Sequence, residues 1–139
     1  MIKYVLRENK IEGRPSYGKW YAYPVKEETV ELDKLAEHMA QHNTPYSAGA
    51  IKGILTDMVA CIKELLLDGK NVKLSDLAIF SIGIRSKGAE TEEQFTVAAN
   101  VTSLRLRARA TGKLSTKDIT TTVRKAVVVE PAKKKAAEI

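Results

Sequence analysis

The residues of this sequence best suited to chemistry are three alternating arginines, Arg105, Arg107 and Arg109. Residues two apart in an extended strand project from the same face, so these guanidinium groups are expected to line one side of a ribbon. A guanidinium group binds a phosphate or carboxylate through two parallel N–H groups. The pattern therefore predicts a surface that binds a polyanion. The alternative is a solvated strand face that only keeps the protein soluble.

More basic residues flank the arginine run. The candidate anion-binding residues between positions 85 and 117 are Arg85, Lys87, Arg105, Arg107, Arg109, Lys113 and Lys117. The same stretch holds three acidic residues, Glu90, Glu92 and Glu93, so its net charge is +4 of the +6 carried by the whole chain. Phosphate contacts fix position without reading a base sequence, so we expect weakly specific binding that falls steeply with salt.

The remaining reactive side chains have ordinary interpretations. His38 and His42 lie four apart, a helical spacing that can chelate a metal, but no third ligand is evident and we interpret them as a solvent-facing pair. Cys61 lies in an apolar helical stretch, where a thiol behaves as a small hydrophobe. No catalytic triad, phosphate-binding glycine loop or dinucleotide motif is present. We therefore expect no enzyme activity, cofactor, metal or small-molecule substrate.

Two helices are predicted upstream of the arginines. The first is expected to be capped by Thr29 and to run to about Gln41. The second is expected to be capped by Ser47 and to end at Leu67, before Gly69. Its apolar positions repeat every three or four residues and are Ala50, Ile51, Ile54, Leu55, Met58, Val59, Ile62, Leu65 and Leu66. So broad a stripe indicates that a second subunit shares the core.

Alternating patterns predict the strands. They occur at 2–7 and 19–26, which suit an N-terminal β hairpin, and then at 72–74, 80–85 and 104–110. Residues 88–93 are polar and suit a loop, after which Phe95 and Val97 are expected to resume a strand. A short helix is expected within 114–124.

Length and composition are consistent with one main domain. The chain has 139 residues, a hydrophobic fraction of 44% and a pI near 9.4. We expect a β extension at 1–28, a main domain at 29–124 and a basic tail at 125–139. The apolar runs are far shorter than the roughly 20 residues of a membrane span, and the N-terminus does not read as a secretory signal. The default expectation is therefore a cytoplasmic protein.

Two short motifs and the order of elements resemble the bacterial histone-like HU/IHF family of DNA-binding proteins. Leu65 to Leu74 looks like the family's helix end and first strand, and Thr111-Gly112-Lys113-Leu114 with Asp118 looks like its Gly-Lys-x-Leu-x-Asp close. Phe80 keeps the aromatic of a Gly-Phe-Gly-x-Phe turn whose glycines are here Asp76 and Ala78. The match covers roughly 29–119, and the extra N-terminal strands resemble the HU-like branch that carries such a segment.

The resemblance implies an α+β fold, with two helices packed on a small antiparallel sheet that extends into a β arm, in an intertwined dimer. It implies a dimer core of Ile51, Ile54, Leu55, Met58, Val59, Ile62 and Phe80. The expected function is architectural: binding of double-stranded DNA with low specificity through a basic ribbon, and bending or condensing it on the nucleoid. A homodimer is expected, with a heterodimer as the alternative.

One departure from the family keeps a second function open. Family members carry a proline near each arm tip that kinks the duplex, whereas this tip holds Glu90, Glu92, Glu93 and no proline. Phe95 could act as an apolar wedge in its place, although a packed Phe95 is the preferred interpretation. The alternative is an HU-like structural or protein-interaction dimer that has lost strong DNA binding, with the aromatic N-terminal hairpin as its contact surface.

Overall fold

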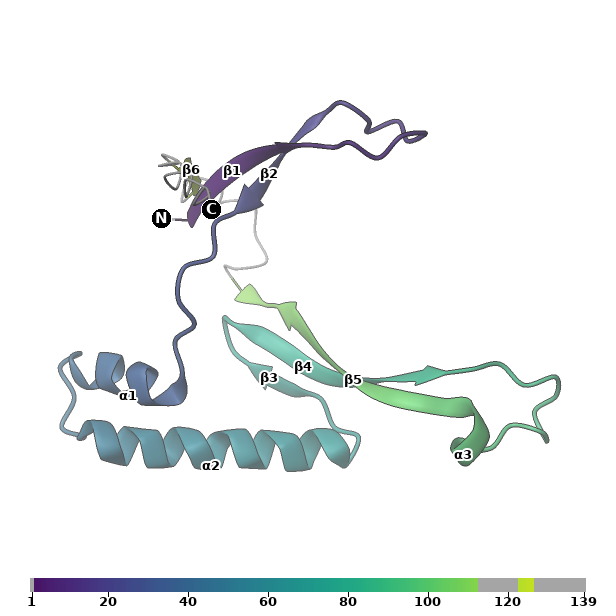
Figure 1. Cartoon of the computed structure of the whole chain (residues 1–139). Coiled ribbons are helices and arrows are strands. Elements are labelled where there is room, and N and C mark those ends of the chain that lie inside the picture. The colour runs from purple at the N-terminus through teal and green to yellow at the C-terminus, as the bar shows by residue number, and fades with distance from the viewer. Residues whose placement is uncertain (1, 113–122, 127–139) are drawn as a thin grey trace, which may run out of the picture. The chain divides into compact units, whose positions relative to one another are not determined.

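The computed structural model describes residues 2–112 and 123–126. The chain divides into two compact units, one formed by 1–28 with 117–139 and the other by 29–116. The described part of the first unit is a three-stranded sheet. That of the second contains two longer helices, a one-turn helix and another three-stranded sheet (Figure 1). The predicted α+β class is confirmed, and no helix in the described residues is long and apolar enough to cross a membrane.

Helix α1 (Leu32–Ala40) begins later than the sequence predicted. Its N-cap is Glu31, whose extended backbone makes no side-chain cap hydrogen bond, so the expectation of a Thr29 cap is wrong. The first helical hydrogen bond runs from the Leu35 N–H to the Glu31 carbonyl at 2.9 Å. Half-buried Leu32 is the first α1 side chain able to pack, so packing and not capping sets where this helix starts.

Helix α2 (Ala48–Leu67) matches its prediction. The Ser47 hydroxyl accepts a hydrogen bond from the Ala50 N–H at 3.2 Å, which satisfies one of the free donors at the helix start. The helix ends at Asp68, and Gly69 follows with φ +79°, a left-handed conformation that glycine adopts without steric cost. Figure 1 shows α1 alongside the first part of α2 and the sheet beside its second part.

The sheet of this unit has the order β3-β4-β5, from β3 (Val72–Leu74), β4 (Ala78–Ser86) and β5 (Val101–Ala110), all antiparallel. Strands β4 and β5 continue past β3 as a two-stranded ribbon (Figure 1). Its register is continuous until Arg85, after which Ser86 pairs with Val101 and Thr102 is the extra residue. The Thr102 hydroxyl donates to the Arg85 carbonyl at 3.0 Å across this bulge.

The turn between β3 and β4 explains the glycine replacements seen in the sequence. Asp76 has φ +60°, so this position keeps the left-handed backbone although its side chain is not glycine, and Asp tolerates that conformation better than most residues. Ala78 begins β4 with an ordinary backbone. Gly112, with φ +63°, passes so close that a Cβ there would lie 2.7 Å from the Asp76 Cα.

The loop at the end of the ribbon is organised by Asn100, the one buried polar residue in the described part of the chain, 8% exposed. Its amide donates to the carbonyls of Lys87 and Gly88 at 3.1 and 3.2 Å, and its Oδ1 accepts from the Thr96 N–H at 3.0 Å. Thr96 caps the one-turn helix α3 (Val97–Asn100). The expected strand at Phe95 and Val97 is therefore wrong, because these hydrogen bonds hold the segment in a compact loop.

The N-terminal sheet has the order β2-β1-β6 and confirms the predicted hairpin. Strands β1 (Ile2–Glu8) and β2 (Trp20–Pro24) pair antiparallel, and β6 (Val123–Lys125) pairs parallel to β1. The short helix expected within 114–124 lies largely outside the described residues, and its last two positions are strand instead. The guanidinium of Arg7 lies 5.2 Å from the Tyr23 ring centroid, a cation–π contact on one sheet face.

The core of the second unit is small for its length. Its buried apolar side chains, among the described residues, are Ala36, Ile51 and Leu66. Most of the predicted α2 stripe and the apolar sheet face stay partly open, with Ile54 and Leu106 62% and 65% exposed. An apolar hollow of about 440 Å³ between α2 and the sheet is lined by Met58, Val59, Ile62, Lys63, Leu66, Leu67, Leu74, Phe80, Ile82 and Leu106.

Candidate nucleic-acid interface

The register of the second sheet sorts its side chains into two faces. Residues directly opposite one another in an antiparallel pair share a face. The face turned from α2, here called the basic face, carries Lys73, Ile79, Ser81, Gly83, Arg85, Ser103, Arg105, Arg107 and Arg109. The other face carries Val72, Leu74, Ala78, Phe80, Ile82, Ile84, Leu104, Leu106, Ala108 and Ala110. The predicted division of the last strand into an arginine side and an apolar side is confirmed.

Gly83 shapes the centre of the basic face. A Cβ at this position would lie 2.6 Å from the Arg107 Nε and 2.8 Å from its Cζ. The guanidinium of Arg107 thus lies across the sheet in the space that a side chain at 83 would fill. Because Gly83 pairs with Arg105 and Ser81 with Arg107, two arginines are brought beside one small-residue strip. The sequence contains both residues, but only the register shows that they touch.

The cations of the basic face are exposed to solvent. Ion pairs in the described residues include Lys3 with Glu27, 2.9 Å, and Lys70 with Asp68, 2.7 Å. Within residues 2–112 and 123–126, none of Lys73, Arg85, Arg105, Arg107 and Arg109 forms an ion pair with a carboxylate. Alternate strand residues stand roughly 7 Å apart, so like charges at this spacing repel, and an external polyanion would relieve that repulsion.

Lys73 is a member of this face that the sequence analysis missed. It pairs with Ile79 on β3 and so projects with the arginines of β5. The alternation Val72-Lys73-Leu74 was a signal for it, but a three-residue strand gives no indication of which neighbour it joins. Beside it, a hollow of about 600 Å³ is lined by Asn71, Ile79, Ser81, Arg107, Ala108 and Arg109. Two of its lining residues, Arg107 and Arg109, are cations of the basic face.

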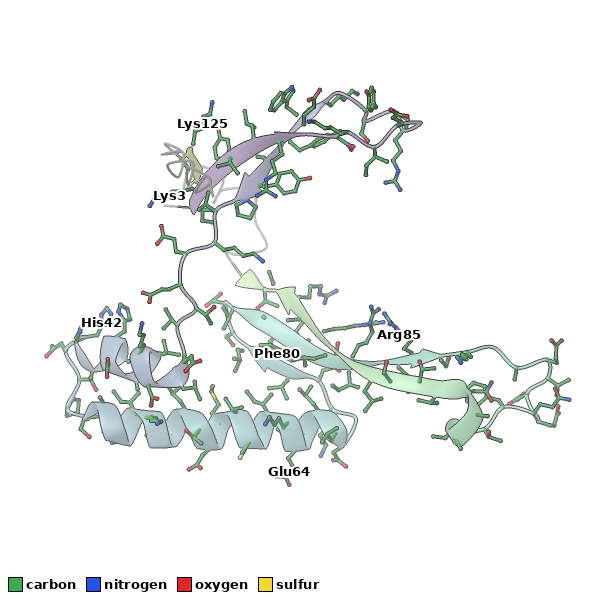
Figure 2. All side chains as sticks on the ribbon, viewed as in Figure 1. Lys3, His42, Glu64, Phe80, Arg85 and Lys125 are labelled. Atoms are coloured by element: carbon green, nitrogen blue, oxygen red, sulfur yellow. The ribbon has the colours of Figure 1, made fainter. Side chains whose placement is uncertain are left out.

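The charge changes sign along the ribbon. Arg85 lies on β4 near the bulge (Figure 2), and Lys87 follows at the base of the loop, where its N–H donates to the Asn100 carbonyl at 2.7 Å. Beyond it, Glu90, Glu92 and Glu93 are exposed in the loop. The Phe95 N–H bonds the Glu92 carbonyl at 3.1 Å and the Phe95 side chain is 42% exposed. The basic face therefore ends before the tip, as the sequence indicated.

Two predicted anion-binding residues, Lys113 and Lys117, lie outside the described residues. The other five, Arg85, Lys87, Arg105, Arg107 and Arg109, are all exposed, and four of them share the basic face. Lys87 lies past the bulge, outside the paired part of the ribbon. Among the described residues no group of three or more His, Cys, Asp and Glu side chains is placed to hold a metal ion.

Comparisons with known protein families and structures agree with the HU-like resemblance. The family model HU-HIG, described as an HU domain fused to wHTH, Ig or glycine-rich motif, matches residues 1–125. The chain belongs to this family. Among curated proteins none matches. A solved structure, that of a presumed bacterial DNA-binding protein from Bacteroides vulgatus ATCC 8482, is similar at a TM-score of 0.64 and 14% identity, over 89% of this chain and 47% of that one.

Membership of the HU-HIG family confirms the HU-like resemblance inferred from the motifs. At 14% identity the Bacteroides protein shows the fold alone, and the present chain spans about half of its length. In this HU-HIG chain the residues predicted to form a dimer core differ in how far they are buried. Ile51 is buried, Ile54 is largely exposed, and Leu55, Val59, Ile62 and Phe80 are half-buried, with Met58 37% exposed.

Proposed function

We propose that this HU-HIG chain binds double-stranded DNA with low sequence specificity through the basic face of β3-β4-β5. The observation that supports it most directly is the register, which places Lys73, Arg85, Arg105, Arg107 and Arg109 together with no carboxylate partner in the described residues. The HU domain and the Bacteroides neighbour's description favour the same function. No catalytic role, cofactor or small-molecule substrate enters the proposal, and a place on the bacterial nucleoid follows from it.

The side chains of the basic face suit recognition of DNA phosphates rather than of bases. Guanidinium groups bind phosphate oxygens bidentately, and such contacts position a protein without reading sequence. The face lies on a two-stranded ribbon, a shape that can follow a DNA groove. The ribbons of two chains could hold two separated stretches of one duplex. The DNA would then have to curve to contact both ribbons, and this curvature would bend or condense it.

We further propose that the functional unit is a dimer, a homodimer unless a second HU-like chain takes the partner's place. A single chain leaves the α2 stripe and the apolar sheet face partly open around a hollow of about 440 Å³. Exposed apolar patches of this kind mark protein interfaces. A partner that fills the hollow would complete the core of residues Ile51, Ile54, Leu55, Met58, Val59, Ile62 and Phe80. The unit of residues 29–116 would then form the HU-like domain, shorter than the expected 29–124 because β6 pairs with β1, and 1–28 would form the β extension of its branch.

A salt series tests the DNA proposal. The affinity for a labelled duplex of mixed sequence is measured by fluorescence anisotropy at several salt concentrations. If all five cations of two chains contact phosphates, the slope of log K against log salt is about −9. The variant with Arg105, Arg107 and Arg109 changed to Ala removes six of those contacts, so its slope should be shallower by about 5.

The control variant removes the same charge elsewhere. Changing Lys10, Arg14 and Lys19 to Ala takes three exposed cations from the loop between β1 and β2. This variant should bind with nearly the wild-type slope if the basic face carries the contacts. Equal losses in the two variants would mean that only net charge matters, and salt-insensitive or absent binding in the wild type would refute the proposal.

A second function is favoured by two other observations. The ribbon tip is acidic, with Glu90, Glu92 and Glu93 exposed, and the N-terminal sheet exposes Trp20 and Tyr23 at 63% and 45%. These features suit an HU-like dimer whose partners are proteins, with DNA binding weakened. Absence of duplex binding together with an intact dimer would select this second function.

A further inference from the structure

Two histidines at the end of α1 direct ring nitrogens toward each other. The Nε2 atoms of His38 and His42 are 3.2 Å apart, and the ring centroids are 4.8 Å apart with the planes inclined by 71°. Both side chains are exposed, and His42 lies at the C-terminal end of α1 (Figure 2). The sequence showed only the spacing of four, which is equally compatible with rings that point away from each other.

We propose that His38 and His42 form a binding site for one transition-metal ion of the class that prefers imidazole, such as Cu²⁺, Ni²⁺ or Zn²⁺. Metal–imidazole bonds are about 2.0–2.1 Å long. Two nitrogens 3.2 Å apart can both bind one ion at that length with an N–metal–N angle of about 100°. This angle lies between the square-planar and tetrahedral values, so neither ring has to move far to coordinate.

The backbone around the pair supports the site. The Gln41 N–H bonds the His38 carbonyl at 3.2 Å, and the His42 N–H bonds the Met39 carbonyl at 3.1 Å. These two bonds close the last turn of the helix and hold both histidines one turn apart. The unpaired carbonyls of a helix C-terminus carry partial negative charge, which favours a cation there. The position of the pair is thus favourable electrostatically as well as geometrically.

The metal-free chain already holds the two Nε2 atoms at a distance that one ion can span. At 3.2 Å one ring N–H donates to the lone pair of the other nitrogen, and either ring can be the donor. An incoming ion takes the place of that shared proton: the donor ring gives its Nε2 proton to solvent and takes one up at Nδ1, so both rings coordinate as neutral imidazoles. With no third His, Cys, Asp or Glu grouped with the pair in the described residues, water fills the other coordination positions. The site is therefore an open, exchangeable one, and Cu²⁺ should bind it most tightly of the three ions.

Copper titration of the full chain, purified without a polyhistidine tag, tests the site. Cu²⁺ is added at about pH 8, where imidazole is neutral, and binding is followed by calorimetry and by electron paramagnetic resonance. The expected result is one tight site per chain with two nitrogen ligands. His38→Asn and His42→Asn should each lower the affinity at least about tenfold, because the second ligand acts at high effective concentration.

A matched variant separates chelation from histidine content. Exchanging two neighbours, His42→Asn with Asn43→His, keeps the composition and changes the spacing from four to five. It should lose affinity as the single variants do. Both histidines are exposed, so circular dichroism should show that the variants fold. Equal affinity in all four proteins, a single nitrogen ligand in the wild type, or NMR broadening by Cu²⁺ at residues other than 38–43 would overturn the proposal. None of these readouts depends on DNA binding.

Discussion

Leu106 offers the sharpest test of the proposed two-chain core. Its side chain lies on the apolar face of β5 and lines the hollow with Met58 and Phe80, yet it is 65% exposed in a single chain. Burying a leucine side chain fully contributes about 1.5–3 kcal/mol. About two thirds of its surface is exposed in one chain, so its burial by a partner would contribute about 1–2 kcal/mol to dimer stability.

The substitution Leu106→Ala should therefore weaken the dimer measurably. A two-fold dimer contains the leucine twice, so the loss is about 2–4 kcal/mol, and each 1.4 kcal/mol is tenfold in the dissociation constant. We expect the dissociation constant to rise about 100-fold, measured by sedimentation equilibrium over a concentration series. The unfolding midpoint of the variant should also be lower than that of the wild type at the same protein concentration. Met58→Asp is a more severe substitution in the same core and should leave no folded dimer, because it buries an unpaired charge.

The control for this experiment lies on the same strand. Ser103→Ala changes a side chain on the basic face, opposite Arg85, and should leave dimerisation unchanged. A Leu106→Ala protein that dimerises as tightly as the wild type would contradict the reasoning. So would a wild-type chain that unfolds cooperatively as a monomer at every concentration, since the exposed apolar face would then need no partner.

Two further substitutions test how the ribbon is built. Asn100→Ala removes three hydrogen bonds to the loop backbone and should destabilise the fold by about 1–3 kcal/mol. Chemical denaturation measures the loss, hydrogen exchange should show it concentrated at residues 87–100, and unchanged exchange there would refute the assigned role. Gly83→Val should displace the Arg107 guanidinium while keeping the strand, because the group that must move is the end of a flexible side chain. Duplex affinity should fall by about fivefold, and by no more when Arg107→Ala is added; an additive loss would show that the two residues act independently.

Much of the second unit could be predicted because local spacing encodes it. The α2 stripe and the Ser47 cap depend on residues three or four apart, and the alternation of β5 depends on residues two apart. Both patterns are read within one element, and the structure confirms both elements. The left-handed residue that follows α2 could also be predicted from local sequence, because glycine, here Gly69, adopts this conformation at the lowest cost.

The errors lie where distant residues decide the conformation. Phe95 and Val97 have strand character by composition, but Asn100 draws the loop together through backbone groups up to 13 positions away. The start of α1 was assigned to Thr29 because its side chain suits a cap, whereas the helix begins where Leu32 can pack. In both cases a local preference of a few tenths to about 1 kcal/mol is outweighed by tertiary contacts.

The sequence by itself determined the charges, the HU-like motifs and the division of β5 into a basic and an apolar side. These depend on composition and on the two-residue repeat of a strand. Only the tertiary structure decided that Lys73 joins the arginines, that Arg107 lies over Gly83 and that β6 pairs with β1. The reason is physical: a repeat fixes which side chains share a face of one strand, whereas the register between strands is set by turns, bulges and hydrogen bonds that join residues far apart in the chain.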